Sequence, residues 1–337
     1  MLGDIKLGAK NKLNLPNQIA AAIAAKIDEG LLVNETFLPS LIDFSEKYKV
    51  SKATVEKAYN ILRESGYVRS APGKGYYVFG KGSNKLRVLF ILNKISSFKK
   101  ITFYSFLKKI GDKAIVDLQI HHYNPKLLNE IINQSLNKYD YFVLMPHFEF
   151  DALPKKYLEV IKRIPSHKLL ILDKHLPKLS PMKVVYQDFK SDIYDALTDA
   201  KSHIEKYKSI VLIFPEYGNH PQEIILGVKQ FGKDEGKNVS VIYNNIANVI
   251  PVKETLYIII TDEDLGTIIK IIKKTNFVLG SDIGIISFNE TDLKDVLDIT
   301  VISTDFSKMG ETAADLILTG KNEIIRNPFS MIKRGSL

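Results

Sequence analysis

The chain has 337 residues, of which 45% are hydrophobic and 25% are charged, as in a globular protein rather than a disordered or fibrous one. It has no cysteine, which excludes disulfides, thiolate zinc sites and a cysteine nucleophile and suits a reducing cytoplasm. The net charge of +9 permits a nucleic-acid partner without requiring one. The first residues lack the apolar core of a signal peptide, and no apolar run approaches the ~20 residues that span a bilayer, so we expect a cytoplasmic protein with no membrane partner.

Residues 1–80 have the pattern of a small helical domain. Apolar side chains recur every three or four positions up to Gly30 and again before Gly66, and glycine favours the left-handed backbone at which helices end. Three helices are therefore predicted. In the second helix we expect Ile42 and Phe44 to face inward.

A hairpin is predicted to follow these helices. The runs at 67–69 and 76–78 are rich in β-forming residues and flank the turn Pro72-Gly73-Lys74-Gly75. Glycines on both sides of Lys74 let the backbone approach another molecule and present a charge, which suits a wing on the minor groove of DNA. The alternative is a flexible turn without a partner. Three helices and a hairpin predict a winged helix-turn-helix.

The third helix begins with the sequence Ser51-Lys52-Ala53-Thr54, in which Ser51 is a good N-cap. A lysine in the first turn opposes the helix dipole, so helix stability alone does not favour it. It is well placed if this end enters the major groove, where Lys52 can donate to guanine or to phosphate while Thr54 and Lys57 reach phosphates. The alternative is an ordinary solvent-facing helix surface.

The motifs of this region resemble the GntR family of winged-helix regulators. They are Leu38-Pro39-Ser40, Val50-Ser51-Lys52-Ala53-Thr54-Val55, Ala58-Tyr59, Leu62, Gly66-Tyr67-Val68 and Pro72-Gly73-Lys74-Gly75-Tyr76-Tyr77-Val78. The resemblance implies a homodimeric repressor domain on palindromic double-stranded operator DNA. The resemblance places Lys52 at a base contact, Thr54 at a phosphate contact and Gly73 at the tip of the wing. The full set of predicted DNA contacts is Ser51, Lys52, Thr54, Lys57, Arg69, Gly73 and Lys74. Phe37 and Ile42 stand where the family often has arginine, which shifts phosphate binding onto those lysines and Arg69.

Residues 81–86 have linker composition, and residues 87–337 alternate buried strands with amphipathic helices. Apolar runs predict strands at 87–92, 139–145, 168–173, 210–214, 239–243, 256–261, 283–288 and 299–303. Helices are predicted at about 99–110, 125–137, 154–164, 189–207, 221–236, 263–275 and 305–320. This order predicts an α/β fold with one or two doubly wound sheets, and two such lobes around a cleft would form a ligand-binding module.

The second domain resembles the periplasmic-binding-protein-like sensor of LacI-type regulators. The best-matching stretches are 260–263, 282–290 and 299–301. A GntR-type domain followed by such a sensor is the architecture of sugar-utilisation repressors of the arabinose-repressor type. In the LacI-type family a sugar-clamping arginine commonly stands where this chain has Ile224, so either the ligand is atypical or another group, such as Lys94 or Lys174, replaces the arginine.

The resemblance implies a sugar or sugar derivative as effector, bound at the carboxyl ends of the strands. There, carboxylates and amides accept hydroxyl hydrogens and an aromatic ring covers the sugar. The predicted ligand contacts are Asn93, Phe98, His147, Asp173, Gln187, Asp188, Asp262, Asn289 and Glu290. Asp173 and Asn289 are favoured because they end apolar strands and match polar positions of the family. For His147 and Gln187 the simpler interpretation is a satisfied polar residue in a loop.

Other chemistry finds little support in the sequence. It has no phosphate-binding glycine loop, no G-x-S-x-G elbow and no histidine pair at metal spacing, so no cofactor or metal is predicted. His121-His122 and Lys99-Lys100 are interpreted as solvent-facing. We expect a non-enzymatic repressor whose operator affinity changes when a sugar closes the two lobes. The alternative is an α/β sugar-modifying enzyme with a DNA-binding head.

Overall fold

The computed structural model describes residues 14–79, 85–136, 138–149, 154–215, 220–243 and 246–337. The chain forms two compact units that divide between Lys85 and Leu86. Leu86, predicted to lie in the linker, is the first residue of a strand, whereas linker residues 81–84 lie outside the described residues. Of the helices that the structure describes, none is long and apolar enough to cross a membrane.

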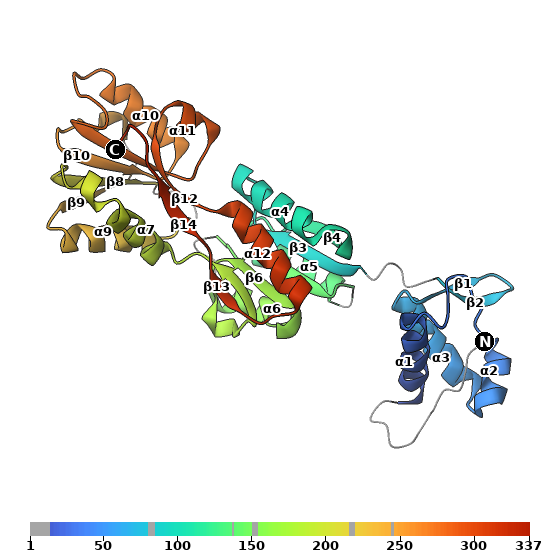
Figure 1. The fold of residues 1–337 in the computed structure, drawn as a ribbon. Helices are drawn as coiled ribbons and strands as arrows, with labels where there is room; N and C mark the ends of the chain where they lie inside the picture. The colour runs from blue at the N-terminus through green and yellow to red at the C-terminus, as the bar shows by residue number, and fades with distance from the viewer. Residues whose placement is uncertain (1–13, 80–84, 137, 150–153, 216–219, 244–245) are drawn as a thin grey trace. The chain divides into compact units, whose positions relative to one another are not determined.

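Residues 14–79 of the first unit form three helices followed by a two-stranded antiparallel sheet, which is the predicted winged helix-turn-helix (Figure 1). Its elements are α1 (Leu15–Asp28), α2 (Leu41–Tyr48), α3 (Lys52–Glu64), β1 (Val68–Ala71) and β2 (Gly75–Val78). Phe44 and Tyr59 are fully buried in its core. The prediction that Ile42 faces inward is wrong, since its side chain is 48% exposed. Two positions along a helix point about 200° apart, so Ile42 and Phe44 cannot share a face.

Each of these helices begins at a polar side chain that caps its free backbone amides. Asn14, Ser40 and Ser51 each accept a hydrogen bond, at 3.1 Å, from the backbone N–H three residues further on. These caps satisfy donors that have no partner within the helix itself. The start of every helix in the first unit is therefore fixed by local sequence.

The second unit consists of two lobes, each built on a six-stranded sheet. In lobe 1 the strand order is β13-β7-β6-β5-β3-β4 and all pairs are parallel. Its elements are β3 (Leu86–Leu92), α4 (Ser97–Ile110), β4 (Ala114–Ile120), α5 (Pro125–Ser135), β5 (Tyr141–Leu144), α6 (Pro154–Ile161), β6 (Leu169–Asp173), β7 (Lys183–Tyr186), α12 (Phe306–Thr319) and β13 (Ile324–Arg326). Helices α4 and α12 pack on one face of the sheet, and α5 and α6 pack on the other.

In lobe 2 the strand order is β14-β12-β11-β10-β8-β9, with only β14 antiparallel to its neighbour. Its elements are α7 (Phe189–Asp199), α8 (Lys201–Ile204), β8 (Ser209–Phe214), α9 (Glu223–Asp234), β9 (Asn238–Tyr243), β10 (Thr255–Ile259), α10 (Asp262–Ile272), β11 (Ile283–Phe288), α11 (Asp292–Val296), β12 (Thr300–Thr304) and β14 (Phe329–Ile332). Helices α7, α8 and α9 cover one face, and α10 covers the other. Lobe 2 is thus a second doubly wound layer, as predicted.

The chain passes between the lobes at three short segments: Gln187-Asp188, Asp305 and Asn327-Pro328 (Figure 1). Asn327 is 2% exposed and ties these segments together. Its backbone N–H donates to the carbonyl of Tyr186 at 2.7 Å, and its side-chain amide donates to the carbonyl of Asp305 at 3.0 Å. Because Asn327 hydrogen-bonds to the segments on both sides, a displacement of one crossing would displace the other two.

All eight strands predicted for the second unit are present, and its described residues form four further strands that were not predicted. Three of these, β4, β13 and β14, lie at sheet edges and are partly exposed, so they lack the continuous apolar run of a buried parallel strand. The fourth, β7, has only four residues and begins with Lys183. The helix predicted over 189–207 is divided into α7 and α8.

Candidate functional site

The amino end of α3 presents basic side chains to solvent. The hydroxyls of Ser51 and Thr54 lie 2.8 Å apart, and Ser51 also caps the helix, so these two side chains hold the first turn in shape. Lys52 and Lys57 are exposed, and neither has an ion-pair partner among the described residues. The predicted recognition end of the helix therefore has a capped first turn that carries Lys52, with Lys57 exposed further along the same helix.

The tip of the hairpin is a tight turn. The backbone N–H of Lys74 donates to the carbonyl of Ala71 at 3.0 Å, while Gly73 and Gly75 adopt φ angles of +73° and +92°, which glycine tolerates best. The side chain of Lys74 is exposed at this tip. The guanidinium of Arg69 lies 3.2 Å from the centre of the Phe79 ring, so Arg69 is restrained by an aromatic neighbour although it remains exposed.

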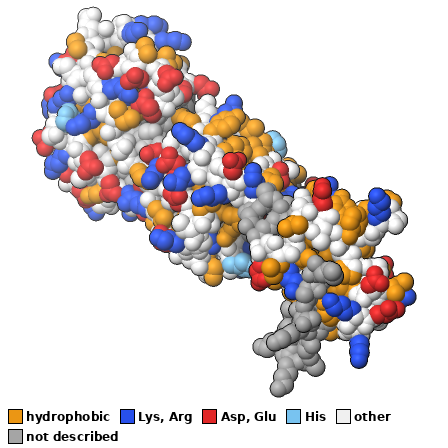
Figure 2. All heavy atoms as spheres, turned by 45° about the vertical axis from the view of Figure 1, so that its right-hand side comes forward, with side chains coloured by type: hydrophobic (Ala, Val, Ile, Leu, Met, Phe, Trp, Pro, Cys, Tyr) orange, Lys and Arg blue, Asp and Glu red, His pale blue; other side chains and the backbone are white. Residues whose placement is uncertain are grey.

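Acidic and basic side chains are interspersed over the face of the molecule drawn in Figure 2. The net charge of +9 therefore does not form one continuous basic field on that face. The cations available for a DNA contact are therefore the exposed Lys52, Lys57 and Lys74, whatever the total charge.

The second unit contains a cleft at the carboxyl ends of the strands of both lobes, with a cavity of about 340 Å³. This volume lies within the range of small-molecule sites. Lobe 1 contributes Asn93, His147 and Asp173 from the ends of β3, β5 and β6, and lobe 2 contributes Asp262 and Asn289 from the ends of β10 and β11. The rings of Phe98 and Phe306 stack at 4.9 Å on the cavity wall. Both lobes thus supply polar groups to one site.

Asp173 is the centre of a buried polar cluster in lobe 1. Lys99 Nζ lies 3.5 Å from Asp173 Oδ2, and His147 Nε2 lies 2.7 Å from the same oxygen. Burial alone would raise the pKa of Asp173, but Lys99, His147 and a hydrogen bond from Gln187 hold it below its usual range. Burial lowers the pKa of Lys99 and of His147. The carboxylate therefore stays ionised and fully engaged.

Gln187 connects this cluster to lobe 2. Its amide nitrogen donates to Asp173 Oδ1, and its amide oxygen accepts a hydrogen bond from the hydroxyl of Thr304. Gln187 lies at the first chain crossing between the lobes, and Thr304 is the last residue of β12, directly before the second crossing. The simpler interpretation of Gln187 as a satisfied loop residue is thus correct for its hydrogen bonds, yet the residue also lines the cavity.

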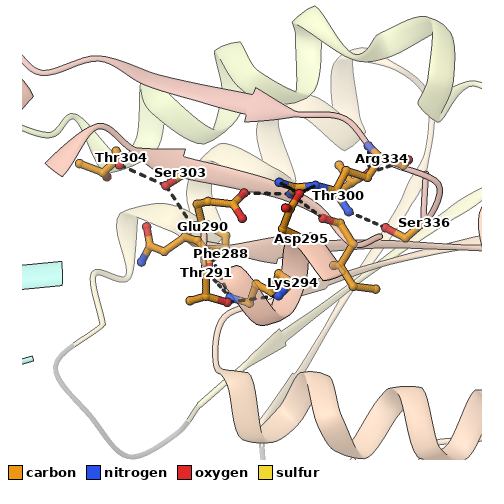
Figure 3. Close-up of polar contacts among 12 residues, drawn as sticks. Phe288, Glu290, Thr291, Lys294, Asp295, Thr300, Ser303, Thr304, Arg334 and Ser336 are labelled. Atoms are coloured by element: carbon orange, nitrogen blue, oxygen red, sulfur yellow. Dashed lines mark hydrogen bonds and ion pairs between the residues drawn. The ribbon is translucent and has the colours of Figure 1, made fainter. Parts of the chain in front are cut away.

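The end of β11 is held by a buried lysine, as Figure 3 shows. Lys294 is 2% exposed and donates to the carbonyls of Phe288 at 2.6 Å and Asn289 at 2.9 Å. Its Nζ also lies 2.7 Å from Asp262 Oδ1. These contacts fix the loop in which Asn289 adopts a φ of +61° and faces the cavity. Asp262 therefore has a structural partner as well as a place on the cavity wall.

Two of the nine predicted ligand contacts lie outside the cavity lining. Asp188 caps α7 by accepting from the backbone N–H of Ser191 at 3.1 Å. Glu290 forms an ion pair with Arg334 Nη1 at 2.9 Å, which Figure 3 shows as a dashed line. Both carboxylates serve local structure. The other seven, Asn93, Phe98, His147, Asp173, Gln187, Asp262 and Asn289, line the cavity.

Several lining residues were not predicted. Lys99, interpreted as solvent-facing, has a side chain only 12% exposed and enters the cleft, whereas Lys100 is exposed. Lys94 lines the cavity, whereas Lys174 is not among its lining residues, and Ile224 lies in an adjoining inner part of the cleft. The other lining residues that were not predicted include Phe189, His220, Phe288, Thr304 and Phe306. No local pattern marks them, because they meet only when both lobes are folded.

His121 also differs from its prediction, while His122 is exposed as expected. The side chain of His121 is fully buried behind β5, where Nε2 lies 3.1 Å from the carbonyl oxygen of Met145. Burial lowers the pKa of His121 to about 4, so the ring is neutral near pH 7. It packs against Phe148 and serves the core of lobe 1.

The first unit matches a known family. Residues 15–78 match the family described as bacterial regulatory proteins, gntR family. The HTH-type transcriptional regulator TreR of Bacillus subtilis (strain 168) is 32% identical over 90 residues, which cover 27% of this chain and 36% of that relative. The match thus spans about a third of the relative's length. It agrees with the resemblance inferred from the motifs.

Solved structures share the fold of the second unit at low sequence identity. The trehalose repressor from Escherichia coli has a TM-score of 0.59 at 15% identity, covering 74% of this chain and 100% of that one. A LacI family transcriptional regulator from Lactobacillus casei with bound glucose has a TM-score of 0.57 at 12% identity, covering 74% and 99%. The chain therefore joins a winged-helix domain that matches the gntR family over residues 15–78 to a two-lobed α/β domain that shares the fold of solved LacI-type regulators.

Proposed function

We propose that this chain is a ligand-responsive transcriptional repressor of a carbohydrate-utilisation operon. Its first unit binds double-stranded operator DNA, and the cleft of its second unit binds a sugar or sugar derivative. The observation that carries the proposal is the presence on one chain of a gntR-type winged helix with free cations on α3 and a two-lobed unit with a polar, aromatic-lined cavity. The solved structures named as a trehalose repressor and as a regulator with bound glucose support this class of ligand, and the relative named TreR supports the role in transcription.

A ligand in the cleft would touch polar groups of both lobes, so it binds the closed arrangement better than the open one. Such differential binding shifts the population toward closure. Closure changes the geometry presented to the DNA-binding units and lowers operator affinity. The coupling between two such sites is typically about 1–3 kcal/mol.

The proposal includes a homodimer that acts in the cytoplasm on a palindromic operator. A dimer places one winged helix on each half-site of a palindrome, so it makes twice as many DNA contacts as a monomer. Light scattering on the purified full chain, alone and with DNA, measures this directly. A monomer bound to DNA at one protein per site would contradict the dimer.

The DNA-binding part is tested by selecting bound sequences from a random duplex pool with purified protein. On the selected DNA, Lys52→Ala should weaken binding by about tenfold to a hundredfold, as expected for a base contact of about 1–3 kcal/mol. Arg63→Ala is the control, since Arg63 is exposed in the last turn of the same helix. Equal affinity of Lys52→Ala and the wild type would remove Lys52 from the interface.

The ligand-binding part is tested by a thermal-shift screen against pentoses, hexoses, disaccharides, uronic acids and sugar phosphates. A ligand at a hundred times its dissociation constant stabilises the folded state by about 2.7 kcal/mol. Asp173→Ala should abolish the shift, whereas Asp188→Asn, which keeps the cap and lies outside the cavity lining, should retain it. Recovery of unchanged ligand after incubation is expected for a binding site. Turnover would instead support the sugar-modifying enzyme.

A further inference from the structure

One carboxylate in the cleft has an oxygen without a partner. Asp192 lies in the first turn of α7, is 2% exposed, and lines an inner cavity of about 110 Å³ that adjoins the main one. Its Oδ1 accepts from Arg326 Nε at 2.7 Å. Its Oδ2 is buried and has no hydrogen-bond partner among the described residues.

This arrangement destabilises the fold unless a donor reaches Oδ2 of Asp192. A buried acceptor without a donor costs free energy, and the cost is greater for a charged group. Burial raises the pKa of Asp192 to about 6 even though Arg326 lowers it, which shows that the ion pair does not fully compensate the carboxylate. A donor from a bound molecule would relieve this cost.

The rest of the inner cavity limits what that molecule can be. Its walls are mainly apolar and aromatic: Phe189, Ile224, Ile260, Phe288, Phe306 and Phe329. The amide of Gln187 is already engaged at both ends, with Asp173 and with Thr304. An anionic group would face the carboxylate of Asp192 without a free cation among the lining residues. A ring with an apolar face and a hydroxyl edge satisfies both the walls and the acceptor.

We propose that Asp192 is a ligand-contacting residue whose Oδ2 accepts a hydrogen bond from a hydroxyl of a sugar-like ligand, and that the inner cavity takes an uncharged end of that ligand. This inference rests on the proposed function and specifies which groups recognise the ligand. Phosphate or carboxylate substituents belong at the other end of the cleft, where Lys94 lines the cavity and has no ion-pair partner among the described residues.

The same carboxylate also joins the two lobes. Arg326 belongs to β13 of lobe 1, and Asp192 belongs to α7 of lobe 2, directly beside the chain crossings at Gln187 and Asn327. Arg326 Nη2 additionally pairs with Asp195 at 2.7 Å, on the exposed side of α7. A hydroxyl bound to Asp192 therefore contacts the group that anchors the inter-lobe ion pair. Asp195 provides a matched carboxylate that shares Arg326 but does not line the cavity.

The test measures the affinities of glucose, xylose, trehalose and their monodeoxy derivatives by calorimetry at pH 7.5 with the full chain. Asp192→Asn should weaken the best-binding sugar by at least about tenfold, the usual loss for a hydrogen bond to a charged group, whereas Asp195→Asn should change it less than about threefold. One monodeoxy derivative should show the same loss with the wild type and no further loss with Asp192→Asn. Asp192→Ser, checked for folding by circular dichroism, repeats the measurement if the asparagine variant does not fold.

The outcomes separate this inference from the proposed function. Unchanged affinity in Asp192→Asn, together with lost binding in Asp173→Ala, would overturn the role of Asp192 and leave the sugar sensor standing. Additive losses for every monodeoxy derivative would also overturn it, because no hydroxyl would then depend on Asp192. If none of these sugars binds the wild type, both the sugar class and this contact are contradicted.

Discussion

Asp173 and Asp192 are both buried carboxylates of the cleft, yet their surroundings act in opposite directions. Asp173 receives three donors, from Lys99, His147 and Gln187, which hold its pKa below the usual range despite burial. For Asp192 burial dominates and raises the pKa to about 6. The ionised form of Asp173 therefore stabilises the fold, whereas the ionised form of Asp192 opposes it.

This difference predicts how stability depends on pH. Because the pKa of Asp192 rises from 3.8 to about 6 on folding, its contribution is favourable below about pH 4 and is lost as the pH rises through about 6. Relative to Asp192→Asn, the free energy of unfolding of the wild type should fall by on the order of 2 kcal/mol over this range. Urea unfolding followed by circular dichroism measures it, since the chain has no tryptophan.

Asp195→Asn is the control for this experiment. Asp195 shares Arg326 with Asp192, but its side chain is 53% exposed, so its removal should not produce the same pH dependence. A constant difference between the wild type and Asp192→Asn from pH 4.5 to pH 7.5 would show that the Asp192 carboxylate is not destabilised by burial.

At the scale of elements, two helix caps of the first unit allow effects on stability to be distinguished from effects on DNA binding. Ser40 caps α2 and Ser51 caps α3, each with a hydrogen bond of 3.1 Å. Replacing either serine by alanine should destabilise the first unit by about 1 kcal/mol. Only Ser51→Ala should also weaken binding of the selected DNA, because Ser51 shapes the turn that presents Lys52. Thermal melts and fluorescence anisotropy of both variants measure the two effects.

The two variants are matched in chemistry and in expected stability, so they control for each other. If Ser40→Ala weakens DNA binding as much as Ser51→Ala does, the effect comes from general loss of stability. If neither variant changes DNA affinity while both lower the melting temperature, the first turn of α3 does not lie at the DNA.

Elements with strong local signals could be predicted from the sequence, and those defined by distant contacts could not. The buried strands and the capped helices are specified by apolar runs and by residues such as Ser51. Adjacent Lys99 and Lys100 look equivalent in the sequence, yet only Lys99 enters the cleft, because the partner that receives it, Asp173, is far along the chain. The partners of Gln187 and Asp192 likewise come from other segments, including Thr304 and Arg326.

At the scale of the whole second unit, the cleft and the chain crossings form one bonded system. Asp173, at the end of β6 in lobe 1, accepts a hydrogen bond from Gln187 at the first crossing. Gln187 in turn accepts a hydrogen bond from Thr304, directly before the second crossing. Asn327 then joins the second crossing to the third. A ligand that engages the cleft would therefore contact groups that are hydrogen-bonded to the chain crossings, and it couples to DNA binding if it favours one arrangement of the lobes.

Thr304→Val tests this path, since valine keeps the shape of threonine and removes the hydroxyl that donates to Gln187. The ligand should weaken binding of the selected DNA by a factor of about 5 to 150 in the wild type, and the DNA should weaken ligand binding by the same factor. In Thr304→Val we expect this factor to fall about twofold to thirtyfold, with the affinity of the ligand-free protein for DNA unchanged.

Thr267→Val is the control, because its hydroxyl donates to a carbonyl on the exposed surface of α10. Anisotropy titrations with and without ligand give both factors. The same factor in Thr304→Val as in the wild type would mean that closure reaches the DNA-binding unit without the Gln187–Thr304 contact.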